Sequence, residues 1–253
     1  MRVAVAQFAT SFDTAENLTT CLRMIDEVAA CNPGIVVLPE FCNTQPCYSD
    51  HNQVWQQALA IESDFLHQIA QQAKKYACYI VLNVTLRRDL NRDQQDASVQ
   101  SNISITSCLF SPSGELVQQV DKQKLTEQER QFFISEKQAA SVISSDFGKF
   151  GLMSGADSYT FQASRALAIN GAQLICNSEH SFALDTSTLH DITHAVENNV
   201  FIASANKVGA LRPKKSADAL AETTETLLSI SNTSVTEQAY GVGQSQIIAP
   251  DGK

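Results

Sequence analysis

The sequence predicts an α/β fold, because short apolar runs typical of buried strands alternate with longer amphipathic runs typical of helices. One apolar run, residues 35–38, contains no polar residue, which indicates a strand that is buried on both faces. The chain has 253 residues, and α/β structures of this length commonly enclose one core. We therefore expect a single domain over residues 1–253.

The first part of the chain predicts a strand, a helix and a second strand. Residues 3–8 form the first apolar run. Asp13 and Glu16 have the spacing of a capping box, and the helix that they start ends at the turn of residues 32–34. The strand at residues 35–38 follows, so Glu40 is expected just beyond a strand end.

The next part predicts a helix, a strand and a β-hairpin. Residues 63–76 carry apolar side chains at helical spacing, and residues 78–84 form a strand. Alternating polar and apolar residues at 102–106, followed by a turn at 111–114, indicate the hairpin. Its second strand ends shortly before Lys122, which places this lysine at another strand end.

The third part repeats the alternation of strand and helix. Residues 150–154 predict a strand, residues 159–170 a helix that Gly171 ends, and residues 172–176 a further strand. Gly155 is therefore expected on a turn from strand to helix, where enzymes often present a nucleophile.

The last part predicts one more helix and strand, at residues 186–199 and 201–206. Residues 210–237 are different, since they are rich in Lys, Ser, Thr, Ala and Glu and lack a steady period. We expect a long, partly mobile excursion there.

The charge balance excludes two classes of partner. The net charge is −9 and the isoelectric point is about 5.0, and neither Lys nor Arg forms a cluster. Nucleic acid and anionic membranes attract basic surfaces, so we expect neither as a partner. The apolar start of the chain is too short for a signal peptide, and no segment is long enough to span a membrane. We expect a soluble, cytoplasmic protein.

Cysteine and histidine residues do not form a metal-binding pattern. Seven cysteines, an odd number scattered mostly within apolar runs, indicate reduced and packed thiols. His180 and His194 lack the spacing of metal ligands, so we expect them at the rim of a pocket or on the surface. Residues 241–243 lack the third glycine of a dinucleotide fingerprint. We therefore expect no metal ion and no cofactor.

Five short segments occur in an order that is typical of one enzyme family. They are the Leu-Pro-Glu of residues 38–40, the Lys-Gln-Lys-Leu that opens residues 122–133, the Gly-Leu-Met-Ser-Gly-Ala-Asp that opens residues 151–172, residues 195–206, and residues 243–252. Together they resemble the nitrilase-type carbon-nitrogen hydrolases. The resemblance implies a four-layer α-β-β-α sandwich that pairs with itself through outer helices, as a homodimer or larger homo-oligomer. In that family the chain continues beyond the turn at residues 250–252, so this chain is expected to be truncated at its C-terminus.

The resemblance also implies the residues of an active site. The family hydrolyses amides with a cysteine nucleophile, a glutamate base, a lysine that stabilises the oxyanion, and a second glutamate. Glu40 matches the base, Lys122 the oxyanion donor and Glu129 the second glutamate, whereas Gly155 stands at the position of the nucleophile. The backbone N–H of Ala156 is expected to serve as a second oxyanion donor. Glycine has no sulfur, so the covalent route is closed to this chain.

Three functions stay open at this point. The first is a protein without ordinary hydrolase activity that keeps a pocket for a small amide or carboxylate. The second is an active amidase that uses a replacement nucleophile or a water activated by Glu40. Ser154 and Cys176 are the candidate replacements, although the Ser154 hydroxyl is expected to point away from Glu40. The third is a non-catalytic partner in an oligomer, with a regulatory role.

The surroundings of Gly155 suggest how the cysteine was lost. The family usually has an aromatic residue at Ala156 and Phe-Pro-Glu at residues 160–162, and this chain has neither. These changes favour natural divergence over an engineered substitution. Asp157 is expected to cap the helix that begins near residue 159. The walls of a pocket are expected from the loops at residues 42–53 and 180–185, with Cys176 and His180 near its rim.

Overall fold

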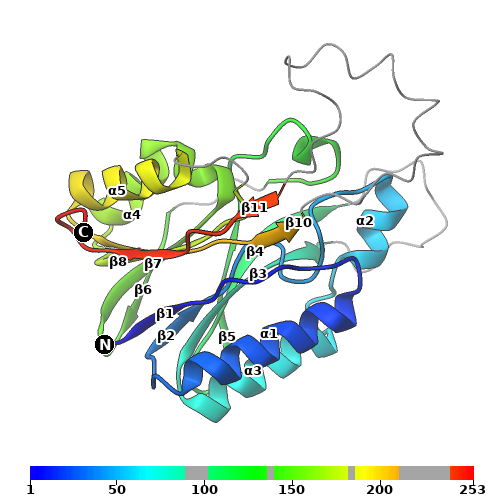
Figure 1. The fold of residues 1–253 in the computed structure, drawn as a ribbon, viewed down its shortest axis with the longest axis horizontal. Helices are drawn as coiled ribbons and strands as arrows, with labels where there is room; N and C mark the ends of the chain where they lie inside the picture. The colour runs from blue at the N-terminus through cyan, green and yellow to red at the C-terminus, as the bar shows by residue number, and fades with distance from the viewer. Residues whose placement is uncertain (89–101, 136–139, 182–185, 211–239) are drawn as a thin grey trace.

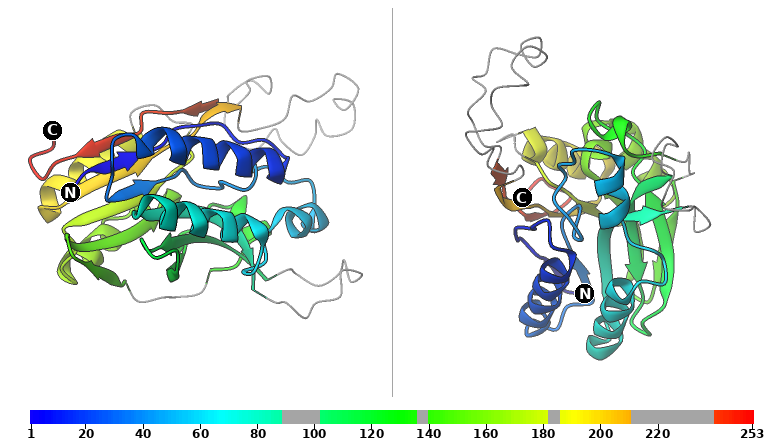
Figure 2. Two further views of the ribbon diagram at one scale, coloured as in Figure 1. Left: turned by 90° about the horizontal axis from the view of Figure 1, so that it is seen from below. Right: turned by 90° about the vertical axis from the view of Figure 1, so that its right-hand side faces the viewer.

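Two five-stranded sheets face each other in the computed structural model, and helices cover the outer face of each sheet (Figure 1). Helices α1 and α3 lie outside one sheet, and α4 and α5 lie outside the other, as the two further views also show (Figure 2). The predicted four-layer α-β-β-α sandwich is confirmed. The structure describes residues 1–88, 102–135, 140–181, 186–210 and 240–253. The helices are α1 (Thr14–Ala29), α2 (His51–Gln57), α3 (Asp64–Tyr76), α4 (Phe161–Ile169) and α5 (Thr186–Asn198), with single 3₁₀ turns η1 (Glu129–Gln131) and η2 (Gly155–Tyr159).

The first sheet has the strand order β1-β2-β3-β4-β5. β1, β2 and β3 are parallel to one another, and β4 pairs antiparallel with β3 on one side and with β5 on the other. All three residues of β2 are buried, as the uninterrupted apolar run predicted. The strands are β1 (Val3–Val5), β2 (Ile35–Val37), β3 (Tyr79–Arg87), β4 (Ile103–Phe110) and β5 (Leu116–Asp121).

The second sheet has the strand order β12-β9-β8-β7-β6, and its three central strands are parallel. Because the carboxyl ends of β2, β7 and β8 deliver the loops that follow them to one region, residues from distant parts of the chain can meet there. The strands are β6 (Val142–Ser145), β7 (Gly148–Ser154), β8 (Leu174–Ser178), β9 (Phe201–Ala205) and β12 (Gln246–Ile248), and β10 (Val208–Ala210) pairs separately with β11 (Tyr240–Val242).

Local capping explains where the first helix starts. The side chain of Asp13 accepts hydrogen bonds from the N–H groups of Ala15 and Glu16, at 2.8 and 3.1 Å. The predicted capping box is only half formed, because the Glu16 carboxylate accepts a hydrogen bond from the Ser11 hydroxyl instead. The helix boundary predicted at Asp13 is therefore confirmed by its cap.

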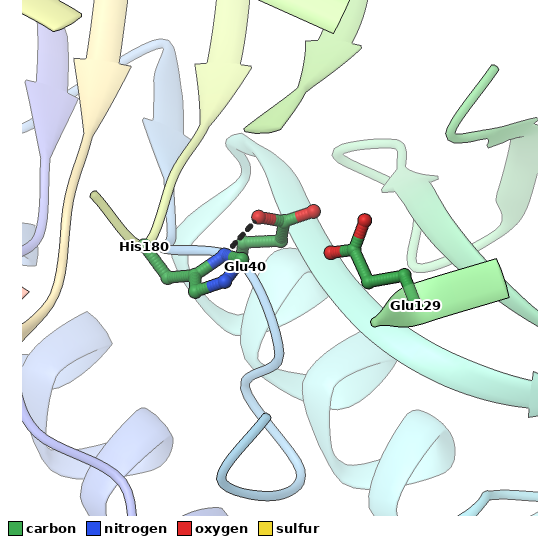
Figure 3. A group of neighbouring side chains, drawn as sticks. All are labelled: Glu40, Glu129 and His180. Atoms are coloured by element: carbon green, nitrogen blue, oxygen red, sulfur yellow. Dashed lines mark hydrogen bonds and ion pairs between the residues drawn. The ribbon is translucent and has the colours of Figure 1, made fainter. Parts of the chain in front are cut away.

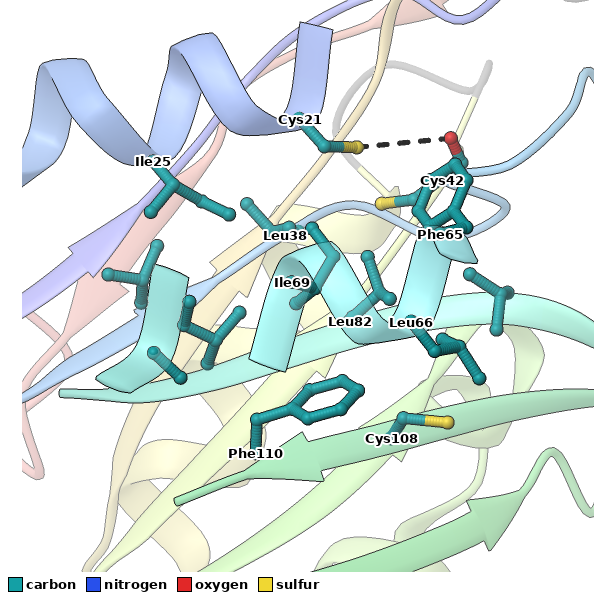
Figure 4. Packing of buried hydrophobic residues seen from close by; sticks show 14 of the residues in the cluster. Cys21, Ile25, Leu38, Cys42, Phe65, Leu66, Ile69, Leu82, Cys108 and Phe110 are labelled. Atoms are coloured by element: carbon teal, nitrogen blue, oxygen red, sulfur yellow. Dashed lines mark hydrogen bonds between the residues drawn. The ribbon is translucent and has the colours of Figure 1, made fainter. Parts of the chain in front are cut away.

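Apolar side chains fill the space between the layers. One cluster lies between α1, α3 and the first sheet, and Ile25, Ile69 and Phe110 are among its members (Figure 4). A second cluster lies between the two sheets and includes Val37 and Phe150. Five of the seven cysteines are buried, and no disulfide forms within the described parts of the chain. The five buried thiols therefore pack as small apolar side chains, as expected, whereas Cys31 is exposed.

Several predicted boundaries differ from the structure. The strand predicted at residues 172–176 lies at Leu174–Ser178, and the helix predicted at residues 159–170 lies at Phe161–Ile169, after the 3₁₀ turn η2. Part of the loop predicted at residues 42–53 is the helix α2. Most of the excursion predicted at residues 210–237, and much of the loop at 180–185, lie outside the described residues. Among the residues that are described, no helix has the length and apolar character needed to cross a membrane.

Candidate active site

Glu40 lies just after β2 and points into the space between the two sheets. Its side chain is completely buried. Its backbone N–H donates to the carbonyl of Glu179 at 3.2 Å, and the N–H of Phe41 donates to Oδ1 of Asn83 at 3.0 Å. Phe41 has a φ of 55°, a left-handed conformation that few residues adopt without support. The chain thus turns sharply after Glu40, and both sheets hold the turn in place.

Lys122 follows β5 and bridges two carboxylates. Its ammonium lies 2.9 Å from Oε1 of Glu40 and donates to Oε1 of Glu129 at 2.6 Å. The Glu129 end of the bridge is held, since its other carboxylate oxygen accepts from the N–H of Thr126 at 2.8 Å. Lys122 is only 1% exposed, so water screens these charges little.

The charges in this cluster stabilise one another. Burial by itself would raise the pKa of Glu40, but the positive charge of Lys122 and the contact with His180 outweigh it and lower this pKa to about 2. Burial would likewise lower the pKa of Lys122, yet the two glutamates raise it above its ordinary value. The structure therefore holds an ionised carboxylate and a protonated amine at neutral pH.

His180 approaches Glu40 from the opposite side, after β8. Its Nδ1 shares a short hydrogen bond with Oε2 of Glu40 (Figure 3). The imidazole ring also meets the ring of Phe41 edge-on, with 5.0 Å between centroids. The side chain of His180 is 14% exposed, whereas those of Glu40 and Lys122 are almost completely covered. His180 is therefore the most accessible of these three groups.

Gly155 lies against the ion pair, at the junction of β7 and η2. Its φ of 48° is in the left-handed region, where glycine is favoured. A Cβ atom added there would lie 2.5 Å from Oε2 of Glu40 and 2.6 Å from Nζ of Lys122. Such distances are shorter than real contacts, so the carboxylate and the ammonium fill the space that a side chain would need. Ala156, the next residue, is also buried.

Asp157 connects the turn after β7 with the loop that carries Lys122. Its carboxylate accepts hydrogen bonds from the N–H groups of Gln123 and Lys124, the shortest at 2.6 Å. The prediction that its side chain caps the following helix is wrong, since α4 starts later, after Thr160. Burial raises the pKa of Asp157 to about 6. The carboxylate thus fixes the Lys122 loop against the Gly155 turn.

Two sequence-based expectations about the rim are wrong. Cys176 lies in the middle of β8, is completely buried among apolar side chains between the sheets, and has a pKa that burial raises above its ordinary value. A neutral thiol buried in the core cannot act as the replacement nucleophile considered in the sequence analysis. His194 is 3% exposed and its Nε2 lies 2.7 Å from the carbonyl of Ser158, so it is an interior residue.

Lys207 is a buried charge that the sequence analysis missed. Its ammonium donates to Oγ1 of Thr10 at 2.6 Å and to the carbonyls of Phe41 and Thr44 at 2.8 and 3.1 Å. Burial lowers its pKa to about 8. These bonds hold the turn that follows Glu40. Lys207 follows β9 as Lys122 follows β5, but this position alone does not distinguish a buried lysine from a surface one.

A metal ion would fit poorly among Glu40, Glu129 and His180. Ligand atoms of Glu40, Glu129 and His180 lie within 4.8 Å of one another, as a metal site requires (Figure 3). However, the ammonium of Lys122 already lies between the two carboxylates. A second cation there would have to displace it or overcome the repulsion between like charges. The donor set is therefore better explained as an ion-pair network.

Comparison with known proteins agrees with the geometry. The sequence model of the carbon-nitrogen hydrolase family matches residues 2–253. No curated protein matches the chain significantly.

Several solved structures are similar to this one. A mutant of the amidase from Nesterenkonia sp. AN1, with acrylamide added at its active-site cysteine, has a TM-score of 0.73 and 17% identity, over 100% of this chain and 87% of that one. Another mutant of this amidase, described as a member of the nitrilase superfamily, has a TM-score of 0.75 and 19% identity, over 100% and 84% of the chains. The NitFhit protein of C. elegans has a TM-score of 0.76 and 20% identity, over 99% of this chain and 56% of that one. At these identities the likeness establishes the fold.

Proposed function

The chain belongs to the carbon-nitrogen hydrolase family, and we propose that it is an amidase-type member that lacks covalent catalysis and binds a small amide or carboxylate. The observation that carries this proposal is the environment of Gly155. Hydrolysis through an acyl-enzyme requires a side-chain nucleophile, and this position has none. The ion pair of Glu40 and Lys122 occupies the space next to it.

The remaining groups suit a small polar ligand. An amide carbonyl can accept from the ammonium of Lys122 and the N–H of Ala156, and an amide N–H can donate to Glu40. The amidase from Nesterenkonia sp. AN1 takes acrylamide and the acetamide moiety of fluoroacetamide at its active-site cysteine, which supports small amides as the ligand class here. Because the pair is buried, a ligand must separate Glu40 from Lys122, and His180 offers the more accessible approach.

Ammonia release and ligand-induced stabilisation test this proposal together. We expect the chain to release no more ammonia from propionamide, ω-amides, nitriles or N-carbamoyl compounds than its Glu40→Gln variant does. We also expect propionamide or propionate to raise the melting temperature of the wild type in a saturable way, because a ligand that binds only the folded state stabilises it. The same ligand should stabilise Glu40→Gln less. The absence of a thermal shift across the panel would contradict the proposal and favour a purely regulatory partner.

One observation favours the alternative of hydrolysis by water. The hydrogen bond between His180 and Glu40 resembles a base held by a carboxylate, which can take a proton from water. Ammonia release that is lost in both Glu40→Gln and His180→Gln would support this alternative. Release without any dependence on Glu40 would exclude it.

We also propose that the chain forms a homodimer through the outer face of α4 and α5. These two helices pack side by side, and large apolar side chains on and beside them are exposed: Phe161 by 62%, Ile169 by 72%, Leu189 by 65% and Val196 by 52%. A group of exposed apolar side chains is typical of an interface.

Substitution on this face should dissociate the dimer. The double variant Ile169→Asp with Leu189→Asp should have the mass of a monomer in light scattering, because it buries two charges in the interface. Val117→Asp is the control, since Val117 is 47% exposed on the other sheet. A monomeric wild type, or a dimer that survives the double substitution, would exclude this face.

A further inference from the structure

A cavity of about 720 Å³ lies between α4, β7 and the loop that follows Lys122. Its volume is within the range of small-molecule sites in proteins. Glu40, Lys122, Glu129 and His180 do not belong to its described lining, whereas Asp157, which fixes the Lys122 loop, does. The cavity is therefore a separate feature of the fold, and the inference drawn from it does not depend on the proposed function.

One part of the lining is apolar and well covered. It comprises buried side chains from the Lys122 loop, from β7 and from α4, with two small residues of α4 that leave room between them. These residues are Leu125, Leu152, Met153, Leu167, Ala163 and Ala166. An alkyl chain or an aromatic ring placed against them would leave water and gain free energy in proportion to the area covered.

The other part of the lining is polar and carries positive charge. Lys124 and Arg130 both line the cavity and are exposed to solvent. Within the described ranges, neither of them makes an ion pair. Two cations therefore line one cavity in a chain whose net charge is −9. They favour an anionic group at the mouth of the cavity.

The single acidic residue of the described lining does not cancel this charge at the mouth. It is Asp157, which is 5% exposed, and its carboxylate oxygens accept hydrogen bonds from the N–H groups of Gln123 and Lys124. Its negative charge is thus directed into the Lys122 loop. The side chains of Lys124 and Arg130 stay available to a ligand.

We propose that this cavity binds a small amphipathic carboxylate, with an alkyl or aryl body against the apolar lining and the carboxylate between Lys124 and Arg130. The planar guanidinium of Arg130 matches a carboxylate through two parallel hydrogen bonds, and the ammonium of Lys124 adds a point charge. Both parts of the lining are needed for this chemistry, because an apolar cavity alone would accept a neutral molecule equally well.

Calorimetric titration of the full chain with octanoate tests the proposal. Octanoate should bind at one site per chain, and affinity should rise from butyrate to octanoate by up to roughly fourfold per methylene. Octanol and octylammonium should bind roughly tenfold or more weakly, since they lack the charge-assisted hydrogen bonds. Equal binding of octanol would overturn the assignment of a carboxylate, and failure of octanoate to saturate below its micelle concentration would overturn the site.

Matched variants separate this cavity from the rest of the surface. The double variant Lys124→Gln with Arg130→Gln should lower the affinity for octanoate by roughly tenfold or more. Ala163→Leu should fill the apolar part and abolish binding, and its melting temperature will show that it remains folded. Arg165→Gln should bind like the wild type, since Arg165 lies on the same helix but outside the lining. An unchanged affinity in the double variant or in Ala163→Leu would contradict the proposal.

Discussion

Replacing Lys122 by methionine should lower the free energy of unfolding by about 3–5 kcal/mol at neutral pH. The substitution keeps much of the volume of the side chain but removes the charge that lies 2.9 Å from Glu40 and 2.6 Å from Glu129. Two buried carboxylates would then face each other without the ammonium that lies between them. Urea denaturation measures the change, and Lys124→Met is the control. Because Lys124 is exposed, its replacement should change stability by no more than about 0.5 kcal/mol.

The pH dependence of the stability lost in Lys122→Met shows whether lost charge or lost packing causes it. The folded-state pKa of Glu40 is about 2, below its ordinary value of 4.5, so its ionised form contributes stability above pH 4.5 that is lost as pH falls toward 2. The Lys122→Met variant lacks this contribution. The difference in stability between wild type and variant should therefore shrink between about pH 4.5 and about pH 2. A difference that stays constant over this window would mean that lost packing is the cause, not lost charge.

Glu40, Lys122 and Gly155 were proposed as site residues from the resemblance to a family, and each of them also follows a strand. The run before Glu40 is wholly apolar, Lys122 follows a hairpin strand, and layered α/β folds bring the ends of such strands together. The strand-end positions therefore agreed with the resemblance in predicting that these side chains meet. The structure adds that they form one buried network.

The details of the network could not be predicted from the sequence. That the ion pair fills the space beside Gly155 depends on the distance between the two sheets and on side-chain rotamers, neither of which leaves a local pattern. Cys176 was misplaced because its strand runs two residues further than predicted, so a residue expected at a strand end lies in the core. Asp157 was assigned to a helix start because its contacts with residues 123 and 124 are distant in sequence.

Lys207 and the α2 helix were missed for different reasons. A single lysine after a strand is usually a surface residue, and only the three oxygen atoms around its ammonium show that it is buried. The α2 helix is one of seven residues, too short for its period to stand out among polar neighbours. Short elements and buried polar contacts are thus the features for which tertiary structure was needed.

Substituting Gly155 by cysteine should give the chain a reactive thiol, at a cost in stability of about 1–3 kcal/mol. The cost arises because the backbone at this position is left-handed and because the new Cβ must move the ends of Glu40 and Lys122 apart. Both ends belong to flexible side chains, so the movement is feasible. Alkylation by iodoacetamide, followed by intact mass, measures the thiol. Gly155→Ala is the control, since it adds the same Cβ and keeps all seven natural cysteines.

Whether the alkylation rate of the new thiol depends on Glu40 shows if Glu40 can act as a base toward residue 155. If Glu40 can act as a base toward residue 155, the Gly155→Cys variant should be alkylated faster than the same variant combined with Glu40→Gln, because the thiolate is the reactive form. It should also release ammonia from propionamide, which the Gly155→Ala variant should not do. A thiol that reacts equally with and without Glu40 would mean that the ion pair has a structural role only. Restored hydrolysis would instead mean that Lys122, Glu129 and Ala156 still present a complete oxyanion site, and that the side chain missing at Gly155 is what separates this chain from an amidase.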